Sequence, residues 1–265
     1  MIRVFTTAYL EKNPARSVEY RACLSRNLAC HAIDEVCVLV EGEHRVGLRS
    51  PRLRTRKISQ RPQYADYFAW IDELAAPDDI SVIANGDILF DAQLALFKVW
   101  ELPAHVVLAL SRWDVAQDGT ANLFDRNDSQ DTWILRGRVR PVVAGFQIGV
   151  PRCDNRILFE LQQAGYEVIN PALSICSFHL HDGMRGELGT ENLPHYVPPP
   201  YRYLFPHNLW SLPRTCWHNL RHPACRLGWQ VDRRRLSATL PARVLRKLSR
   251  AARSSLRAGA PPHGV

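Results

Sequence analysis

Two aspartates, Asp87 and Asp91, follow a short apolar run at residues 81–84. The run is typical of a buried strand, and Asn85-Gly86 after it is typical of a turn. Ligands of α/β proteins bind at the carboxyl ends of the strands, where an aspartate can hold a divalent cation shared with substrate phosphates. The alternative is structural: the segment is only a turn, and Asp91 caps the next helix.

A third carboxylate, Asp154, stands where a predicted helix opens, before residues 157–164 and the helix stop Gly165. Such a group could act as a general base toward a substrate hydroxyl. It could equally cap the helix and do no chemistry. Asp131 is a second candidate for the base or for a contact to the acceptor, or it is a solvated loop carboxylate.

His179 and His181 lie two residues apart on a predicted strand, so only one of them should face a metal. Asp182-Gly183 places His181 near the strand end, which favours His181, with His179 as the alternative. A histidine at such a place can also be a hydrogen-bonded packing residue rather than a ligand.

The elements that must position these residues alternate between strands and helices. We expect strands at 3–7, 36–40, 81–84, 106–110, 142–150 and 167–170, and helices at 14–29, 64–74, 92–99 and 157–164. We expect irregular structure at 41–60 and a long polar loop at 114–138. The alternation predicts an α/β fold with a mostly parallel sheet and helices on both faces. Neither a G-x-G-x-x-G fingerprint nor a P-loop is present.

The order of these motifs resembles the GT-A class of nucleotide-sugar glycosyltransferases over residues 1–205. The resemblance rests on the segments Arg61-Pro62-Gln63-Tyr64-Ala65-Asp66, Ala84-Asn85-Gly86-Asp87-Ile88-Leu89-Phe90-Asp91 and Cys153 to Pro171, which contains Ala164-Gly165-Tyr166-Glu167-Val168. That class uses a D-x-D motif at a strand end to hold a metal and the diphosphate. Here Asn85 stands in the place of the first acid.

The resemblance implies roles for named residues. Mn²⁺ or Mg²⁺ would bind Asp87, with Asp91 and His181 or His179, and Asp154 would be the base of an inverting transfer. Thr6, Thr7 and Tyr9 would hold the nucleotide base and ribose. The donor site would further include Arg61, Tyr64, Asp66 and Asn85, and Arg112 and Trp113 would line the sugar pocket. Asp66 could instead favour its helix through the helix dipole, and Trp113 could belong to the core.

The charge is concentrated at the C-terminal end. The 265 residues carry a net charge of +8. Residues 214–265 hold eleven Arg and one Lys against Asp232, or +11, which leaves −3 for residues 1–213. We expect a transferase domain at 1–205 and a basic extension at 206–265, partly helical and disordered at its end. Residues 240–258 have the pattern of a basic amphipathic helix, which suits an anionic membrane surface or a solvated tail. The motifs and aromatic platforms of nucleic-acid binding are missing.

Seven scattered cysteines, no signal-peptide pattern and no run long enough to span a membrane predict a cytoplasmic protein, peripheral at most at the inner face of a membrane. The leading hypothesis is a metal-dependent glycosyltransferase that moves a sugar from a nucleoside diphosphate to a glycan or lipid-linked hydroxyl acceptor in surface glycan or polysaccharide assembly. The alternatives are a sugar-phosphate nucleotidyltransferase and a non-catalytic nucleotide- or glycan-binding protein of the same fold.

Overall fold

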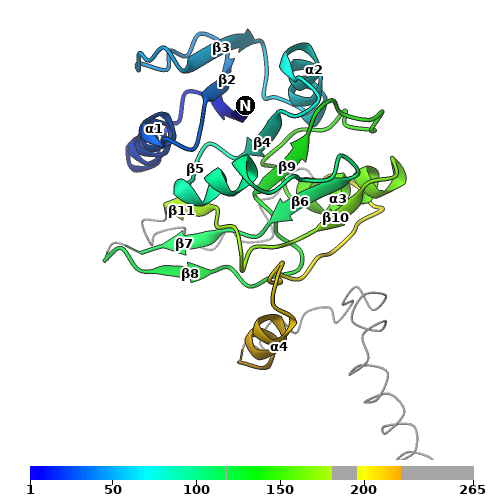
Figure 1. Ribbon diagram of the computed structural model, residues 1–265. Helices are drawn as coiled ribbons and strands as arrows, with labels where there is room; N and C mark the ends of the chain where they lie inside the picture. The colour runs from blue at the N-terminus through cyan, green and yellow to red at the C-terminus, as the bar shows by residue number, and fades with distance from the viewer. Residues whose placement is uncertain (117, 181–195, 222–265) are drawn as a thin grey trace, which may run out of the picture. The chain divides into compact units, whose positions relative to one another are not determined.

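The computed structural model describes residues 1–116, 118–180 and 196–221, and it confirms the predicted α/β fold with a mostly parallel sheet (Figure 1). Seven strands form the main sheet in the order β10-β6-β9-β4-β1-β2-β3. They are β1 (Ile2–Ala8), β2 (Glu35–Glu41), β3 (Leu53–Ile58), β4 (Ile80–Ala84), β6 (Val106–Leu110), β9 (Thr132–Arg136) and β10 (Glu167–Ile169). Only β9 runs antiparallel to its neighbours, β4 and β6.

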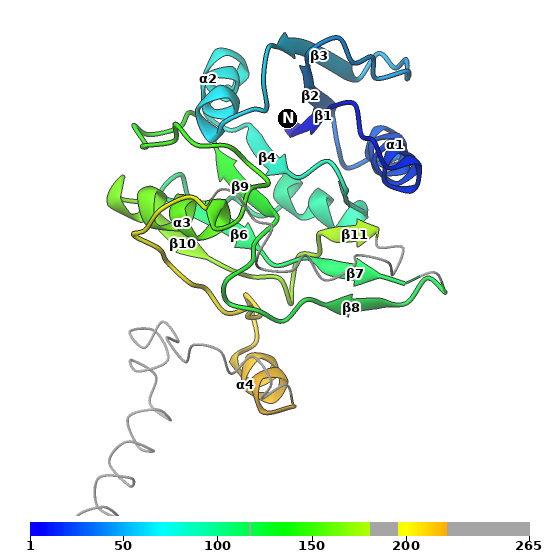
Figure 2. The same ribbon diagram turned by 180° about the vertical axis from the view of Figure 1, so that it is seen from behind.

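Helices cover both faces of this sheet, as predicted (Figures 1 and 2). The helices α2 (Tyr64–Leu74) and α3 (Cys153–Gln163) contribute to one hydrophobic cluster, while α1 (Pro14–Ala29) and the 3-10 helix η1 (Ala92–Lys98) contribute to the other. Successive strand residues alternate between the clusters: Phe5 and Ile83 belong to the first, Val4 and Val82 to the second. Burial on both faces explains why these strands read as continuous apolar runs.

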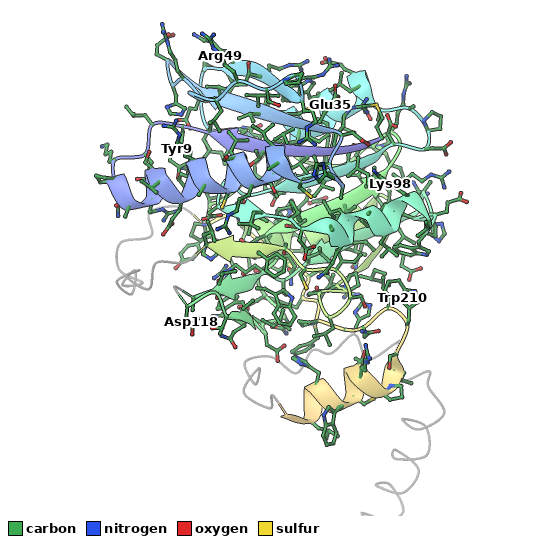
Figure 3. The ribbon with its side chains drawn as sticks, turned by 60° about the vertical axis from the view of Figure 1, so that its left-hand side comes forward. Tyr9, Glu35, Arg49, Lys98, Asp118 and Trp210 are labelled. Atoms are coloured by element: carbon green, nitrogen blue, oxygen red, sulfur yellow. The ribbon has the colours of Figure 1, made fainter. Side chains whose placement is uncertain are left out.

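A second sheet lies beyond the carboxyl end of β4. Its strands are ordered β5 (Ile88–Leu89), β11 (Phe178–Leu180), β7 (Trp113–Val115) and β8 (Ala121–Leu123). After it comes α4 (Leu212–Arg221), which a contact between His218 Nε2 and Asp125 Oδ2 (3.1 Å) ties to the body. The described residues belong to one compact unit, Met1–Arg226. Tyr9, just beyond β1, and Glu35, at the start of β2, mark opposite ends of the main sheet (Figure 3).

The helices predicted at 14–29 and 64–74 and the strand at 106–110 have the predicted bounds. The predicted helix at 92–99 is a 3-10 helix, and the one at 157–164 begins earlier, at Cys153. None of the described helices is long and apolar enough to cross a membrane, and the six described cysteines are free thiols. Residues 240–258 lie outside the described residues, and the division at residue 205 stays a prediction.

Two segments predicted to be irregular contain strands, so those predictions are wrong. Within 41–60, β3 forms the sheet edge beside β2, and its Arg54 and Arg56 pair with Glu35 and Glu73. Charged side chains are common at sheet edges and mask the strand pattern. Within 114–138, the short apolar run of β9 is buried at the centre of the sheet.

The segment 142–150 was predicted as a strand, and this is also wrong. The carbonyl oxygens of Phe146 and Ala144 accept hydrogen bonds from the backbone N–H groups of Tyr64 (3.1 Å) and Ala65 (3.0 Å). Those N–H groups lie in the first turn of α2, where they have no partner within the helix. The segment therefore satisfies a helix N-terminus instead of pairing with another strand.

Candidate functional site

A cavity of about 640 Å³ opens where β1 and β4 end. Its wall comes from the ends of β1 and β4, from the side of α1, from the segment before β9, from the start of α3 and from β11. The side chains and backbone that line it belong to Thr7, Tyr9, Arg16, Tyr20, Glu41, Arg61, Asn85, Gly86, Asp87, Arg112, Phe124, Arg126, Asp128, Ser129, Gln130, Asp131, Trp133, Ile148, Gly149, Val150, Pro151, Arg152, Cys153, Asp154, Asn155 and His179.

Asp87 is held at this cavity by the turn that follows β4. A Cβ atom on Gly86 would lie only 3.1 Å from the carbonyl oxygen of Thr7, so the turn passes too close to β1 for a larger residue to fit without a shift. The Asp87 carboxylate is 7% exposed. Its Oδ2 lies 3.3 Å from His179 Nε2 and 3.6 Å from Arg16 Nη2. Asp87 is therefore a mostly buried anion between two basic side chains.

His179 is fixed by a second carboxylate on its far side. It sits on β11, between β5 and β7, and its Nδ1 lies 2.9 Å from Asp114 Oδ1. Burial alone would lower the pKa of His179, but the hydrogen bonds to Asp114 and Asp87 outweigh it and raise that pKa. Asp114 is an acceptor, since hydrogen bonds from His179 and Arg112 outweigh burial and lower its pKa to about 2. Nδ1 therefore carries a proton, and Nε2 faces Asp87.

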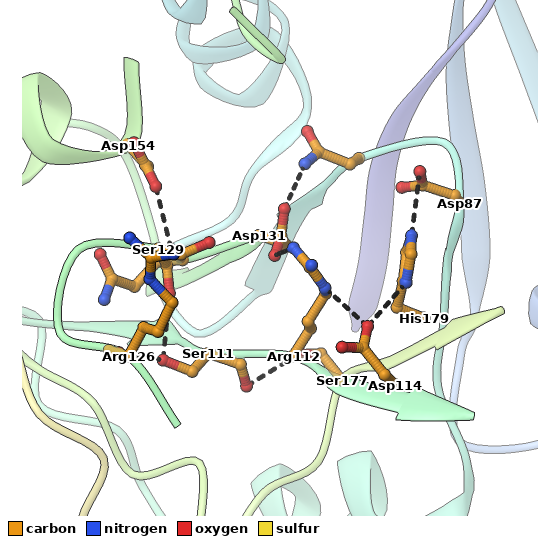
Figure 4. Close-up of polar contacts among 12 residues, drawn as sticks. Asp87, Ser111, Arg112, Asp114, Arg126, Ser129, Asp131, Asp154, Ser177 and His179 are labelled. Atoms are coloured by element: carbon orange, nitrogen blue, oxygen red, sulfur yellow. Dashed lines mark hydrogen bonds and ion pairs between the residues drawn. The ribbon is translucent and has the colours of Figure 1, made fainter. Parts of the chain in front are cut away.

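A chain of charged and polar groups continues from Asp114 (Figure 4). Arg112 donates from Nε to Asp114 Oδ1 (2.8 Å) and from Nη1 to Asp131 Oδ2 (3.0 Å). Asn85 Nδ2 donates to Asp131 Oδ1 (2.7 Å). The residue in the place of the family's first acid thus supports Asp131. The complete chain is Asn85, Asp131, Arg112, Asp114, His179 and Asp87.

Asp154 lies at the other side of the cavity from Asp87 (Figure 4). It is in the first turn of α3, and the N-cap is Arg152, so Asp154 is not the N-cap. Its Oδ2 accepts from the Gln130 N–H (3.2 Å) and its Oδ1 from the Asn155 N–H (2.9 Å). Burial raises the pKa of Asp154 to about 7, with a further contribution from the negative charge of Asp131, against the effect of these two N–H groups. A carboxylate with a pKa near neutral pH is suited to general acid–base chemistry.

Several predicted substrate residues come together at this cavity. Thr7, Tyr9 and Arg61 line it along with Asn85, Arg112 and Asp131. The Tyr9 hydroxyl lies 2.6 Å from the Tyr20 hydroxyl, and the Arg61 guanidinium lies 5.6 Å from the centre of the Tyr9 ring.

Four predicted substrate residues lie elsewhere. Thr6 is buried on β1, and Tyr64 is fully buried in the core, where its hydroxyl contacts Cys153 Sγ at 3.7 Å. Asp66 accepts a hydrogen bond from the backbone N–H of Gln63 (2.7 Å) at the start of α2. The indole Nε1–H of Trp113 donates to the backbone carbonyl oxygen of Ala172 (2.9 Å). None of the four lines the cavity. The contact of Asp66 agrees with the helix-terminus alternative stated for it, whereas Trp113 is half-buried and belongs to neither hydrophobic cluster of the described residues.

One predicted metal ligand, Asp91, is not brought to the site. Asp91 is the N-cap of η1 and accepts from the Gln93 N–H (2.8 Å), outside the cavity wall. Its capping role follows from its place before a helix. His181 lies outside the described residues. Of the four predicted ligands, the structure brings Asp87 and His179 together.

Sequence reasoning missed eight charged or aromatic residues of the wall: Arg16, Tyr20, Glu41, Phe124, Arg126, Asp128, Trp133 and Arg152. The spacing of Arg16 and Tyr20, four apart on the helix after β1, could have indicated that they share a face. Arg126 and Asp128 were assigned to a loop, and only the three-dimensional fold brings them beside Arg152.

The residues around Asp87 fit a divalent cation that is shared with a ligand. Within the described ranges, no group of three or more His, Cys, Asp or Glu side chains could hold a metal alone. A cation bound mainly by substrate phosphates needs only one or two protein ligands. Asp87 Oδ2 and His179 Nε2 can provide them, because Asp114 holds Nδ1 as carboxylates do behind metal-binding histidines.

No family model matches the chain, and no curated protein matches it. Solved structures do. The mannosyltransferase PcManGT from Pyrobaculum calidifontis in complex with GDP-Man and Mn²⁺ is 13% identical, with a TM-score of 0.46 over 70% of this chain and 58% of that one. S. aureus TarS with UDP-GlcNAc is 9% identical, with a TM-score of 0.46 over 70% and 59%. The 4-diphosphocytidyl-2C-methyl-D-erythritol synthase of Anaerococcus prevotii is 11% identical, with a TM-score of 0.35 over 51% and 69%.

This chain spans less than two thirds of the PcManGT and TarS chains that it matches. At these identities and TM-scores the likeness extends to the fold alone.

Proposed function

We propose that this protein is a glycosyltransferase that moves a sugar from a nucleoside diphosphate to a hydroxyl acceptor. The observation that carries the proposal is that one cavity holds two different sets of functional groups, one at each end. One end holds Asp87 and His179, and the other holds Asp154, whose pKa is raised to about 7. An anionic leaving group and a hydroxyl nucleophile need these two kinds of group.

The donor diphosphate would bind at the Asp87 end. Asp87 and His179 would hold Mn²⁺ or Mg²⁺, which when bound neutralises charge on the leaving diphosphate. Arg16, 3.6 Å from Asp87, adds a fixed positive charge there. Tyr9 and Arg61 are connected to this end through Tyr20, since Arg16 and Tyr9 both bond to the Tyr20 hydroxyl. The Tyr9 ring would contact the nucleotide base.

Asp154 would take the proton of the attacking hydroxyl. Its carboxylate is half-buried, and the Gln130 and Asn155 N–H groups hold its orientation. Direct attack assisted by a base inverts the configuration at the anomeric carbon, so we propose an inverting transfer. Because only the ionised form accepts a proton, the rate should fall as pH drops below about 7.

The two alternatives make different demands on the same site. A binding protein has no need of a carboxylate with a pKa near 7 at the end of the cavity far from the diphosphate. In a nucleotidyltransferase, a sugar phosphate attacks the phosphorus of a nucleoside triphosphate. Release of pyrophosphate would therefore distinguish that reaction from the proposed one. A cytoplasmic location and a role in surface glycan or polysaccharide assembly stay predictions from the sequence, as does the contact of residues 240–258 with a membrane.

Binding of nucleoside diphosphates with and without Mn²⁺ tests the donor end. Titration calorimetry should show UDP or GDP binding that requires Mn²⁺ and is lost in Asp87→Ala. Asp91→Ala is the matched control, since Asp91 lies outside the cavity and its loss should affect only η1. Binding that is unchanged in Asp87→Ala would refute the metal assignment, and the absence of binding at millimolar Mn²⁺ would refute the proposed function.

A further inference from the structure

The Asp154 end of the cavity contains two arginines that the transfer itself does not use. Arg126 and Arg152 line the wall together with Asp154. Arg126 lies on the Asp154 side of the site and away from Asp87 (Figure 4). They are therefore placed next to the acceptor and not next to the donor diphosphate.

The two arginines share one carboxylate, Asp128. Arg126 bonds to it through Nε (2.8 Å) and Nη2 (2.7 Å), and Arg152 Nη1 lies 3.7 Å from it. Burial opposes ionisation of Asp128, but the hydrogen bond and charge of Arg126 outweigh it and lower the pKa. Two guanidinium groups therefore lie around one carboxylate at this end of the cavity. Arg112, by contrast, pairs with two carboxylates.

The backbone of Arg152 is in a conformation that residues other than glycine rarely adopt. Its φ is 71°, in the left-handed region, the only positive φ of a non-glycine residue in the described part of the chain. That conformation is unfavourable for a residue with a side chain, and such outliers concentrate at binding sites. Arg152 Nη1 contacts Asn155 Oδ1 (3.3 Å), and its guanidinium lies 5.7 Å from the Tyr201 ring centre. The strained residue thus places a charged group two residues before Asp154.

Two buried side chains of the same wall have polar atoms without a partner. Gln130 is 1% exposed and Trp133 is 2% exposed. Gln130 Oε1 and Trp133 Nε1 make no hydrogen bond in the described structure, although both residues line the cavity. A buried polar atom without a hydrogen-bond partner destabilises the protein unless a ligand or water provides one. An acceptor and a donor in this state suit the hydroxyl groups of a bound saccharide.

We infer that the acceptor carries an anionic group, a carboxylate or a phosphate, which Arg126 and Arg152 bind while a neighbouring hydroxyl meets Asp154. This inference rests on the proposed function for the role of Asp154. The planar guanidinium binds both anions through paired hydrogen bonds. The two guanidinium groups near Asp154 would select such an acceptor over a neutral one.

Ligand-observed NMR titrations of the full chain with glucose, glucuronate and glucose 6-phosphate test the inference. At least one of the two anions should bind about tenfold more tightly than glucose, as one additional charge-assisted hydrogen-bonded contact implies. Arg126→Gln and Arg152→Gln should each remove most of that preference. Both side chains are at least 40% exposed, so neither change should prevent folding. Arg126→Lys keeps the charge and should retain part of the preference.

Arg61→Gln is the matched control, because it removes an arginine from the donor end of the same cavity and should leave the preference intact. A preference for glucuronate alone identifies a carboxylate, and one for glucose 6-phosphate alone identifies a phosphate. The inference is wrong if neither anion is preferred, which includes no detectable binding of any of the three, or if Arg61→Gln removes the preference as fully as Arg126→Gln. These titrations need no donor, so their failure is distinct from a failure of nucleoside-diphosphate binding.

Discussion

Replacing Asp154 by Asn should stabilise the protein at alkaline pH while it removes the catalytic base. The pKa of Asp154 is raised from 3.8 to about 7 on folding, mainly by burial. A carboxyl whose folded pKa is raised contributes stability below pH 3.8, and this contribution is lost as pH rises toward 7. Above pH 7 the folded protein therefore holds a carboxylate that is better solvated in the unfolded chain.

The size of the effect follows from the shift of about 3 pH units. At about 1.4 kcal/mol per unit, the full shift corresponds to about 4 kcal/mol above pH 7. Because Asp154 is only half-buried, solvent in the cavity should screen part of this, and we expect about 2 kcal/mol. About half of it is already present at pH 5.5. Asparagine resembles the neutral carboxyl group in shape and can still accept from the Gln130 N–H.

Urea unfolding of the wild type and Asp154→Asn at pH 8 and pH 5.5 measures this effect. The variant should be more stable by about 2 kcal/mol at pH 8 and by about 1 kcal/mol at pH 5.5. Glu35→Gln is the control. Ion pairs with Arg3 and Arg54 outweigh burial and lower the pKa of Glu35, at the other end of the sheet from Tyr9 (Figure 3). Its loss should therefore cost the same at both pH values. An equal effect of Asp154→Asn at both pH values, or a destabilisation at pH 8, would refute the raised pKa.

Three further substitutions test one residue that orients a proposed metal ligand and two residues that stabilise the fold. Asp114→Asn should lower the affinity for Mn²⁺ in the presence of a nucleoside diphosphate about 10- to 100-fold, because His179 loses its orienting carboxylate. An unchanged Mn²⁺ affinity would contradict this role. Asp66→Ala should lower the free energy of unfolding in urea by about 1 kcal/mol and leave nucleotide binding intact. Weaker nucleotide binding would show that Asp66 contributes to the site after all. Gly137→Ala should cost at least about 1 kcal/mol, since φ is 70° and the added Cβ would lie 2.9 Å from the Pro77 carbonyl oxygen; an unchanged unfolding midpoint would count against this conflict.

The sequence predicted the elements whose pattern is decided locally. Residues 14–29 carry an N-cap, Asn13, and Pro14 at the first helical position, and the helix has these bounds. Residues 106–110 are an apolar run buried on both faces. The apolar run in β9 covers only residues 133–135 and follows a polar segment. Its place between β6 and β4 therefore depends on contacts with those two strands.

The site could be predicted only in part for a similar reason. Asp87 follows from its position after a strand. The contact of His179 with Asp87 depends on the register of β11 with β5 and β7, which no local pattern indicates. The role of Asn85 also depends on a distant partner, Asp131, 46 residues away in the sequence.

The acceptor end was the least predictable part. Arg126 and Arg152 belong to segments that are separate in sequence, and their common partner Asp128 lies in a stretch that reads as a solvated loop. The left-handed backbone of Arg152 has no signal in the sequence, because glycine is the residue expected there.

Hydrolysis of a panel of nucleotide sugars, measured as release of the nucleoside diphosphate across pH 5 to 9, tests the central claim most directly. It needs no knowledge of the acceptor, since water can replace it slowly. We predict that at least one nucleotide sugar is hydrolysed in the presence of Mn²⁺, with a rate that falls below about pH 7 and drops by about 10²-fold or more in Asp154→Asn. No release from any nucleotide sugar, or release that is unchanged in Asp154→Asn, would contradict the account.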